Sequence, residues 1–371
     1  MLTTVSRQRI HGGATPAMLD FGVDVNPFGP PESVRTTVMA HLEAIQRYPD
    51  PQARALREAL ATCHGLSAES ILPGNGSAEL IALIVQALRP TRGERSRTMT
   101  ALVIAPTFTE YEWALEQAGA SIQYAMTQEA DRFRWPESLD GWMPPLDDTD
   151  VVFLCNPNNP TGVTMPRDRV LELAARCEAH QTTLVVDEAF VEWTEAPGQI
   201  SLVSSVPEYP HLVVLRSLTK IFAIPGIRLG YAAASPGLAE TLRAHQSAWP
   251  LNTFALAVGE QLLKETVYVT RSRRLVRDAV QELLESLRRL PGLHPFPTST
   301  NFILCKLTGP NLTSTQLCAQ LAQQGIAVRN CDDFTGLEPG RFIRLGARRP
   351  EENALLLAAL HEQTKGTQNK F

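Results

Sequence analysis

Apolar runs and helical patterns alternate along the middle of the chain, between roughly residues 70 and 235. The strand-like runs, rich in β-branched residues, lie at 101–105, 151–154, 183–186 and 212–215. Helical spacing of apolar positions is found between them, for example at 78–88 and 167–180. Strands that are apolar throughout must be covered on both faces, so the pattern predicts a mostly parallel sheet with helices on both sides. The predicted fold class is therefore α/β.

A different pattern follows the alternating region. Residues 253–290 carry a long helical pattern that ends at a Pro-Gly pair. Two shorter strand-like runs come next, at residues 302–306 and 342–345. Because 371 residues exceed the usual size of one domain, we predict a large domain over 45–252 and a smaller α+β domain formed by 1–44 and 253–371.

The charge balance and the cysteines limit the kinds of protein that this chain can be. With 34 basic and 39 acidic residues the formal net charge is −5, and no basic run is interleaved with aromatic residues, so a nucleic-acid partner is not expected. No apolar run approaches the ~18 residues of a membrane span, and the start does not resemble a secretion signal. The six cysteines form no C-x-x-C pair, which predicts neither a metal site nor disulfides. We expect a cytoplasmic protein.

Candidate chemistry begins with Lys220, which lies three residues after Ser217 and eight before Arg228. A desolvated amine can act as nucleophile and base. A guanidinium can bind a phosphate dianion through two parallel hydrogen bonds. A surface lysine and arginine in a loop would explain this run alone equally well. The run nevertheless resembles the cofactor-lysine motif of fold-type I enzymes that use pyridoxal 5′-phosphate (PLP). That resemblance implies a Schiff base on Lys220 and a cofactor phosphate bound by Ser217, Thr219 and Arg228.

Two segments before this motif fit the same family. In the run from Leu72 to Glu79, Gly76, Ser77 and Ala78 follow a strand-like segment and open a helix, where backbone N–H groups can bind a phosphate. An ordinary helix start is the alternative. The run 105–111 resembles the family segment whose aromatic residue stacks on the pyridine ring, which implies that Phe108 covers the cofactor rather than filling an unrelated core.

Two further segments complete the cofactor pattern. Asn159 lies in an Asn-Pro-rich run, and the resemblance implies that it donates to the phenolic oxygen of PLP and contacts the substrate; an Asn-Pro turn is the plain alternative. Asp187 ends a β-branched run, at the edge where α/β folds bind ligands. A carboxylate there can keep the pyridine nitrogen protonated, or it can simply cap the next helix. Four motifs in the family's order favour PLP binding.

The run around Tyr48 also has a counterpart in the family. In relatives, an equivalent tyrosine reaches the cofactor phosphate of the neighbouring subunit. The resemblance therefore implies a homodimer in which each active site contains a residue from both chains.

The ends of the chain indicate which PLP enzyme this is. Three segments resemble threonine-phosphate decarboxylases, which serve cobalamin biosynthesis: the start around His11 and Gly12, the segment around Asn26 and the residues of 217–231. Histidinol-phosphate aminotransferases are the nearest relatives otherwise. The resemblance covers essentially the whole chain. Phe190 supports the decarboxylase, because many transaminases carry a tyrosine at that place.

The same resemblance assigns the substrate site. It implies that His11 and Gly12 bind the substrate phosphate, and that Arg329 and Arg344 bind anionic groups, Arg344 the carboxylate. Asp24 departs from the family, which has a substrate-binding asparagine there. A carboxylate beside a dianionic phosphate would be repulsive unless it is protonated or turned away.

We therefore expect a decarboxylase that converts O-phospho-L-threonine, a small phosphorylated amino acid, into (R)-1-aminopropan-2-yl phosphate. The alternative is a class I/II aminotransferase of the histidinol-phosphate type. A transcription regulator built on an aminotransferase-like domain is disfavoured, because the catalytic pattern already begins by residue 11 and the net charge is negative. An inactive binding protein is disfavoured because Lys220, Asp187 and Arg228 are all present.

Overall fold

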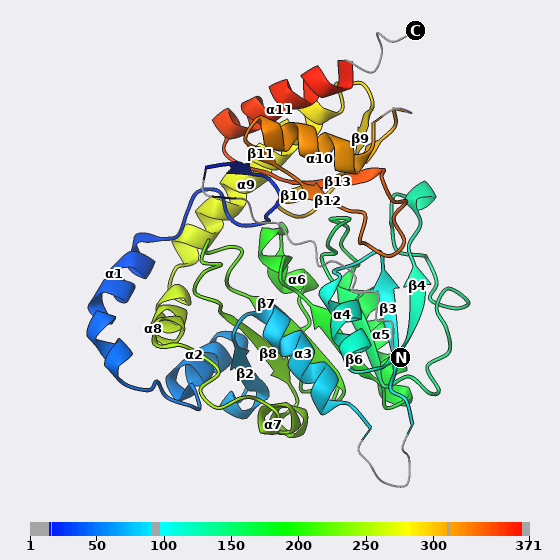
Figure 1. The fold of residues 1–371 in the computed structure, drawn as a ribbon. Helices are drawn as coiled ribbons and strands as arrows, with labels where there is room; N and C mark the ends of the chain where they lie inside the picture. Colours follow the sequence, from blue (N-terminus) through cyan, green and yellow to red (C-terminus); the bar gives the residue numbers. More distant parts are fainter. Residues whose placement is uncertain (1–14, 16, 91–96, 310–311, 366–371) are drawn as a thin grey trace, which may run out of the picture.

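The computed structural model describes residues 15, 17–90, 97–309 and 312–365. A seven-stranded sheet forms its lower lobe, in the order β2-β8-β7-β6-β5-β3-β4 (Figure 1). Its strands are β2 (Ile71–Gly74), β3 (Thr100–Ala105), β4 (Ser121–Met126), β5 (Val151–Cys155), β6 (Thr183–Asp187), β7 (Leu212–Ser217) and β8 (Gly230–Ala234). Only β8 runs against its neighbours, so the other strands share one direction and their carboxyl ends lie at one edge.

Alternate residues of each strand enter two different cores. Val151 and Phe153 of β5 join the core under α3, α4 and α7, whereas Val152 and Leu154 join the core under α2, α5 and α8. These helices are α2 (Arg54–His64), α3 (Ser77–Ala87), α4 (Glu110–Gln117), α5 (Arg167–Ala179), α7 (Pro236–Ala244) and α8 (Thr253–Leu262). Because strand side chains point alternately to opposite faces, continuous apolar strands are what a sheet covered on both sides requires.

Short elements connect this framework. They are α1 (Glu32–Ala40), α6 (Pro197–Ile200) and the 3₁₀ turns η1 (Leu42–Gln46), η2 (Ala68–Ser70), η3 (Glu129–Asp131), η4 (Val191–Trp193) and η5 (Val203–Ser205). Within the described part of the chain, no helix is long and apolar enough to cross a membrane.

The smaller upper lobe, coloured yellow to red in Figure 1, holds an antiparallel sheet in the order β12-β13-β10-β9. The elements of this lobe are α9 (Thr266–Leu287), β9 (Leu293–Pro295), β10 (Phe302–Leu307), α10 (Ser314–Gln323), β11 (Ile326–Ala327), β12 (Arg329–Asn330), β13 (Phe342–Gly346) and α11 (Pro350–Lys365). From the start of the chain, β1 (Leu19–Asp20) pairs in parallel with β11. The N-terminal segment thus leaves the small lobe and passes toward the large sheet.

The prediction of one helical stretch over 253–290 is wrong. Helix α8 ends at Leu262 and α9 begins at Thr266. Helix α8 packs against α1 and α2, with the backbone of Gly259 close to Leu56, and so belongs to the lower lobe. Helix α9 packs against β9, β10 and α11 of the upper lobe. The chain must change direction between the two helices. The predicted end of the helical region before the Pro-Gly pair agrees with the end of α9.

The α/β fold class is confirmed by this architecture. The division into domains at 45–252 stays a prediction, since α1 and α8, which it assigns to the small domain, pack together beside α2 of the lower lobe.

Candidate active site

The carboxyl ends of three neighbouring parallel strands bring the predicted motifs together. Strand β5 ends at Cys155, just before the run that contains Asn159, and Cys155 is in register with Asp187 at the end of β6. The next strand, β7, ends at Ser217, just before Lys220. One edge of the sheet therefore carries the candidate residues for the cofactor.

A cradle for an anion lies where α3 begins. Helix α3 starts at Ser77, and its N-cap residue, Gly76, has no side chain to cap the first N–H groups. Gly76 has a φ of +82°, and a Cβ at this position would collide with the guanidinium of Arg228. A Cβ on Gly230 would lie 3.0 Å from the backbone nitrogen of Ser77. Glycines thus let the backbone, a helix N-terminus and an arginine approach one small space.

Two hydroxyl groups border the same cradle. Ser217 is in register with Gly230, which in turn is in register with Gly74. The Oγ of Ser217 lies 2.8 Å from Oγ1 of Thr219. Both side chains are buried. Together with Gly76, Ser77, Ala78 and Arg228, they form a donor set that fits a dianionic phosphate.

Asp187 is buried at the end of β6. Its Oδ2 accepts a hydrogen bond of 2.8 Å from the Tyr111 hydroxyl, and its Oδ1 accepts one of 3.0 Å from the backbone nitrogen of Ala189. Burial raises the pKa of Asp187 above its ordinary value, although these donors and the charge of Lys220 oppose the rise. A carboxylate that is buried in this way is stabilised when a cationic ring nitrogen lies beside it.

Tyr111 is a site residue whose role the sequence analysis missed. It is fully buried, and burial together with the neighbouring Asp187 raises its pKa well above the ordinary value, so it remains a donor. Its ring makes an edge contact with Phe108 at 5.7 Å between centroids. A signal was available in the sequence, because Tyr111 closes the run 105–111 that already contains Phe108.

Lys220 is the centre of a second cluster. Its Nζ lies 2.5 Å from Oδ1 of Asp24 and 5.6 Å from the centre of the Phe190 ring. Oδ2 of Asp24 lies 3.4 Å from Nη1 of Arg344, and the same Nη1 donates to Oδ1 of Asn159. Asp24 thus joins Lys220 to Arg344, which lies 320 positions further along the chain than Asp24.

Asp24 pairs with the two cationic side chains of this cluster. Although burial alone would raise its pKa, the charges of Lys220 and Arg344 lower the pKa of Asp24 below its ordinary value. The side chain is therefore an ionised carboxylate paired with two cations. Asn301 donates from Nδ2 to the backbone oxygen of Asp24 at 2.8 Å, a contact that no local pattern of residues indicates.

Asn26 fixes the backbone of the lysine loop. Its backbone nitrogen donates to the carbonyl of Lys220 at 3.0 Å, and its Nδ2 donates to the carbonyl of Ile221 at 2.9 Å. The same Nδ2 lies 2.9 Å from the Tyr268 hydroxyl. Asn26 is therefore a positioning residue, which was visible in the sequence only as part of a matching run.

Arg329 is in register with Arg344 across β12 and β13, but its charge is used elsewhere. Its Nη2 lies 2.8 Å from Oδ2 of Asp333, and its guanidinium lies 4.9 Å from the centre of the Phe334 ring. The predicted second anion-binding arginine thus already has a carboxylate partner.

Tyr48 lies on the surface, with 80% of its side chain exposed, and its ring stacks on Trp249 at 4.5 Å. The two rings border a hollow of about 620 Å³ that also reaches Asn75, the residue before Gly76. Tyr48 therefore lies near the phosphate cradle. His11 and Gly12 are outside the described residues.

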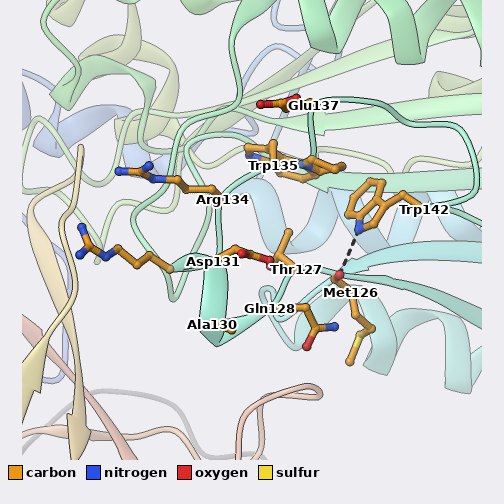
Figure 2. Close-up of a pocket in the computed structure, with 11 residues that line it drawn as sticks. Met126, Thr127, Gln128, Ala130, Asp131, Arg134, Trp135, Glu137 and Trp142 are labelled. Carbon is orange, nitrogen blue, oxygen red and sulfur yellow. Dashed lines mark hydrogen bonds between the residues drawn. The ribbon is translucent and has the colours of Figure 1, made fainter.

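A separate hollow of about 590 Å³ holds none of the predicted site residues (Figure 2). It follows the end of β4, where Trp142 donates from Nε1 to the carbonyl of Met126 at 3.0 Å, and Trp135 packs on Trp142. This hollow therefore contributes none of the candidate chemistry around Lys220.

Comparisons with known proteins agree with this geometry. The family model described as "Aminotransferase class I and II" matches residues 16–360. Threonine-phosphate decarboxylase from Salmonella typhimurium is 34% identical over 94% of this chain and 92% of its own. Histidinol-phosphate aminotransferase 1 from Cupriavidus pinatubonensis is 31% identical over 92% of this chain and 86% of its own.

Solved structures give the same result for the fold. L-threonine-O-3-phosphate decarboxylase from Porphyromonas gingivalis superimposes with a TM-score of 0.80 at 26% identity, over 93% of this chain and 99% of its own. The resemblance inferred from the motifs is confirmed. This chain belongs to the class I and II aminotransferase family, the fold-type I enzymes that depend on PLP.

Proposed function

We propose that this protein is a PLP-dependent decarboxylase that converts O-phospho-L-threonine into CO₂ and (R)-1-aminopropan-2-yl phosphate, for cobalamin biosynthesis. The observation that carries the proposal is a cluster in which Asp24 contacts both the Lys220 amine and a buried arginine, Arg344. Lys220 follows β7, and the neighbouring strand β6 ends at Asp187. Similarity to decarboxylase relatives over nearly the full chain supports the choice of substrate.

The residues of this chain fit the cofactor. Gly76, Ser77, Ala78, Ser217, Thr219 and Arg228 would hold its phosphate, Asp187 its ring nitrogen and Phe108 one face of its ring. When it is bound, PLP supplies a ring that withdraws the electron pair left on Cα when a substituent departs. Asn159 accepts from Arg344 through Oδ1, so its amide nitrogen is the group that would donate to the phenolic oxygen.

Lys220 has two tasks in this proposal. Its amine would hold the cofactor aldehyde until the substrate amine takes its place, and the freed amine would return a proton to Cα of the substrate after CO₂ has left. Asn26 holds the backbone of Lys220, which limits where that amine can go. Proton delivery depends on such placement, because small displacements of a proton donor cost large factors in rate.

Arg344 would bind the substrate carboxylate, because it is buried and contacts Asp24, the carboxylate that also contacts Lys220. The substrate phosphate would be bound by His11, Gly12 and Arg329. The pairing of Arg329 with Asp333 means that the phosphate would compete with an internal carboxylate at that arginine.

We further propose a cytoplasmic homodimer in which Tyr48 of each chain reaches the phosphate cradle of its partner. The support is an exposed aromatic pair, Tyr48 and Trp249, close to exposed Ile45 and to a hollow that reaches Asn75. Large exposed apolar groups that lie together commonly mark an interface.

The deciding experiment uses two reactions. One tube contains the PLP-loaded enzyme and O-phospho-L-threonine labelled at the carboxyl carbon, and the other contains histidinol phosphate and 2-oxoglutarate. We expect labelled CO₂ and aminopropanol phosphate in the first tube and little glutamate in the second. Glutamate formation without CO₂ release would favour the aminotransferase, the second candidate, which is supported by relatives of 31% identity.

A further inference from the structure

Asp24 is held at the centre of the proposed substrate site by contacts on all sides. It is only 6% exposed, and its backbone oxygen accepts from Asn301. Its two carboxylate oxygens lie 2.5 Å from Lys220 and 3.4 Å from Arg344. The side chain therefore occupies the space between the reacting amine and the arginine that would bind the substrate carboxylate.

Arg344 has few donors left for a substrate. Its Nη1 contacts Asn159 and Asp24, and its Nη2 donates to the carbonyl of Gly22 at 3.0 Å. Its Nε is buried and has no acceptor among the described residues. A substrate carboxylate can thus approach one edge of a guanidinium whose charge is already partly neutralised by Asp24.

We infer that Asp24 weakens the hold of Arg344 on the substrate carboxylate and thereby favours the loss of that carboxylate as CO₂; this rests on the proposed function. During the reaction the bond between Cα and the carboxyl carbon breaks, and CO₂ leaves without charge. The electron pair remains with Cα, which then takes up a proton. An arginine that binds the carboxylate strongly stabilises the starting state more than the transition state.

The inference predicts an unusual kinetic signature for Asp24→Asn. Asparagine has the same shape but no charge, so Arg344 would bind the substrate carboxylate more tightly. We expect both KM and kcat for O-phospho-L-threonine to fall, each about fivefold, while kcat/KM changes little. A fall in kcat with an unchanged or higher KM would overturn the inference.

Ligand binding gives a readout that does not depend on turnover. O-Phospho-L-threonine and its product, 1-aminopropan-2-yl phosphate, share the phosphate and the amine but only the first has a carboxylate. Calorimetric titration of the product should give the same Kd with the Asp24→Asn holoenzyme as with the wild type, within about twofold. Tighter product binding by the variant would mean that Asp24 opposes the phosphate, and would overturn the assignment to the carboxylate.

Two control variants accompany these measurements. Glu240→Gln removes a carboxylate from the exposed pair with Arg243 on α7 and should leave both kinetic constants unchanged. Asp24→Glu keeps the charge, so its separate values of kcat and KM should both stay closer to those of the wild type than the values of Asp24→Asn do. If Asp24→Asn fails to fold, Asp24→Ser tests the same loss of charge.

The failure of the inference can be told from that of the proposed function. If the wild type releases no CO₂ from O-phospho-L-threonine, the proposed function fails, whatever Asp24 does. If the wild type releases CO₂ and Asp24→Asn shows no joint fall in KM and kcat, only the inference fails.

Discussion

The phosphate end of the site and its substrate end each depend on an arginine, but the two arginines have different neighbours. Arg228 lies against the backbone of Gly76, its Nη1 donates to the carbonyl of Pro225 at 3.2 Å, and no acid pairs with it within the described ranges. Arg344 is paired with Asp24 before any ligand binds. The difference indicates that one end is preorganised for a resident anion and the other for an anion that must leave.

Lys220 lies where the two ends meet, since it follows Thr219 of the cradle and contacts Asp24. Lys220→Ala should abolish turnover, because no other amine in the cluster can hold the cofactor and return the proton. The wild type should be yellow when loaded with PLP and should keep the label on Lys220 after borohydride reduction, as read by peptide mass. Reduction that labels another lysine would contradict the assignment.

Arg228→Met tests the phosphate end. We expect the Kd for PLP to rise about 30-fold, equivalent to about 2 kcal/mol, because the dianion loses charged hydrogen bonds. The free energy of unfolding of the apoenzyme should change by less than about 0.5 kcal/mol, since no internal carboxylate loses its partner. Fluorescence titration with PLP and denaturant unfolding measure the two quantities. Equal PLP affinity would mean that the cradle is misassigned.

Arg344→Met makes the same change at the substrate end. It should lower the stability of the apoenzyme and leave its affinity for PLP nearly unchanged. Asp24 would remain buried with one cation fewer, so the apoenzyme should lose about 1–3 kcal/mol of unfolding free energy. The Kd for PLP should change less than about threefold. If both methionine variants alter the same quantity, the two ends do not differ in the way described.

Asp187→Asn gives a smaller and pH-dependent effect in the apoenzyme. The pKa of Asp187 is raised in the folded protein, so its ionisation costs stability as pH rises from the ordinary pKa of aspartate to the raised one. Asparagine avoids this cost, and the apo variant should be the more stable protein at pH 7. The advantage should vanish below the ordinary pKa of aspartate, because the Asp187 carboxyl is then neutral in both the folded and the unfolded protein. An advantage that is constant with pH would contradict this explanation.

The phosphate end could be predicted from sequence because it follows from topology. Gly76, Asp187 and Ser217 each end or follow an apolar strand, and parallel strands bring their carboxyl ends to one edge. Local signals were therefore enough to bring these residues to one edge of the sheet, and the helix start at Ser77 agrees with the glycine-rich run. Their assignment to a phosphate came from the family resemblance.

The substrate end could not be predicted in the same way. Asp24 pairs with Lys220 and Arg344, which lie 196 and 320 positions further along the chain. No pattern of residues around any of the three indicates this pairing. The sequence analysis considered Asp24 as a neighbour of the substrate phosphate and did not identify Asp333 as the partner of Arg329. Which charges pair depends on how the small lobe packs on the large sheet, and this has no periodic signature.

The loop from Gly22 to Asn26 contacts the site at every second position. The carbonyl of Gly22 accepts from Arg344, Asp24 contacts Lys220, and Asn26 holds the Lys220 backbone. The amide of Gly346, whose Cα leaves no room for a side chain against Val23, donates to Phe21 at 2.7 Å and fixes the start of the loop. The length of the loop from Gly22 to Asn26 therefore matters to the site as much as its residues do. Inserting or deleting one residue here would separate the three contacts, even where each substitution on its own is tolerated.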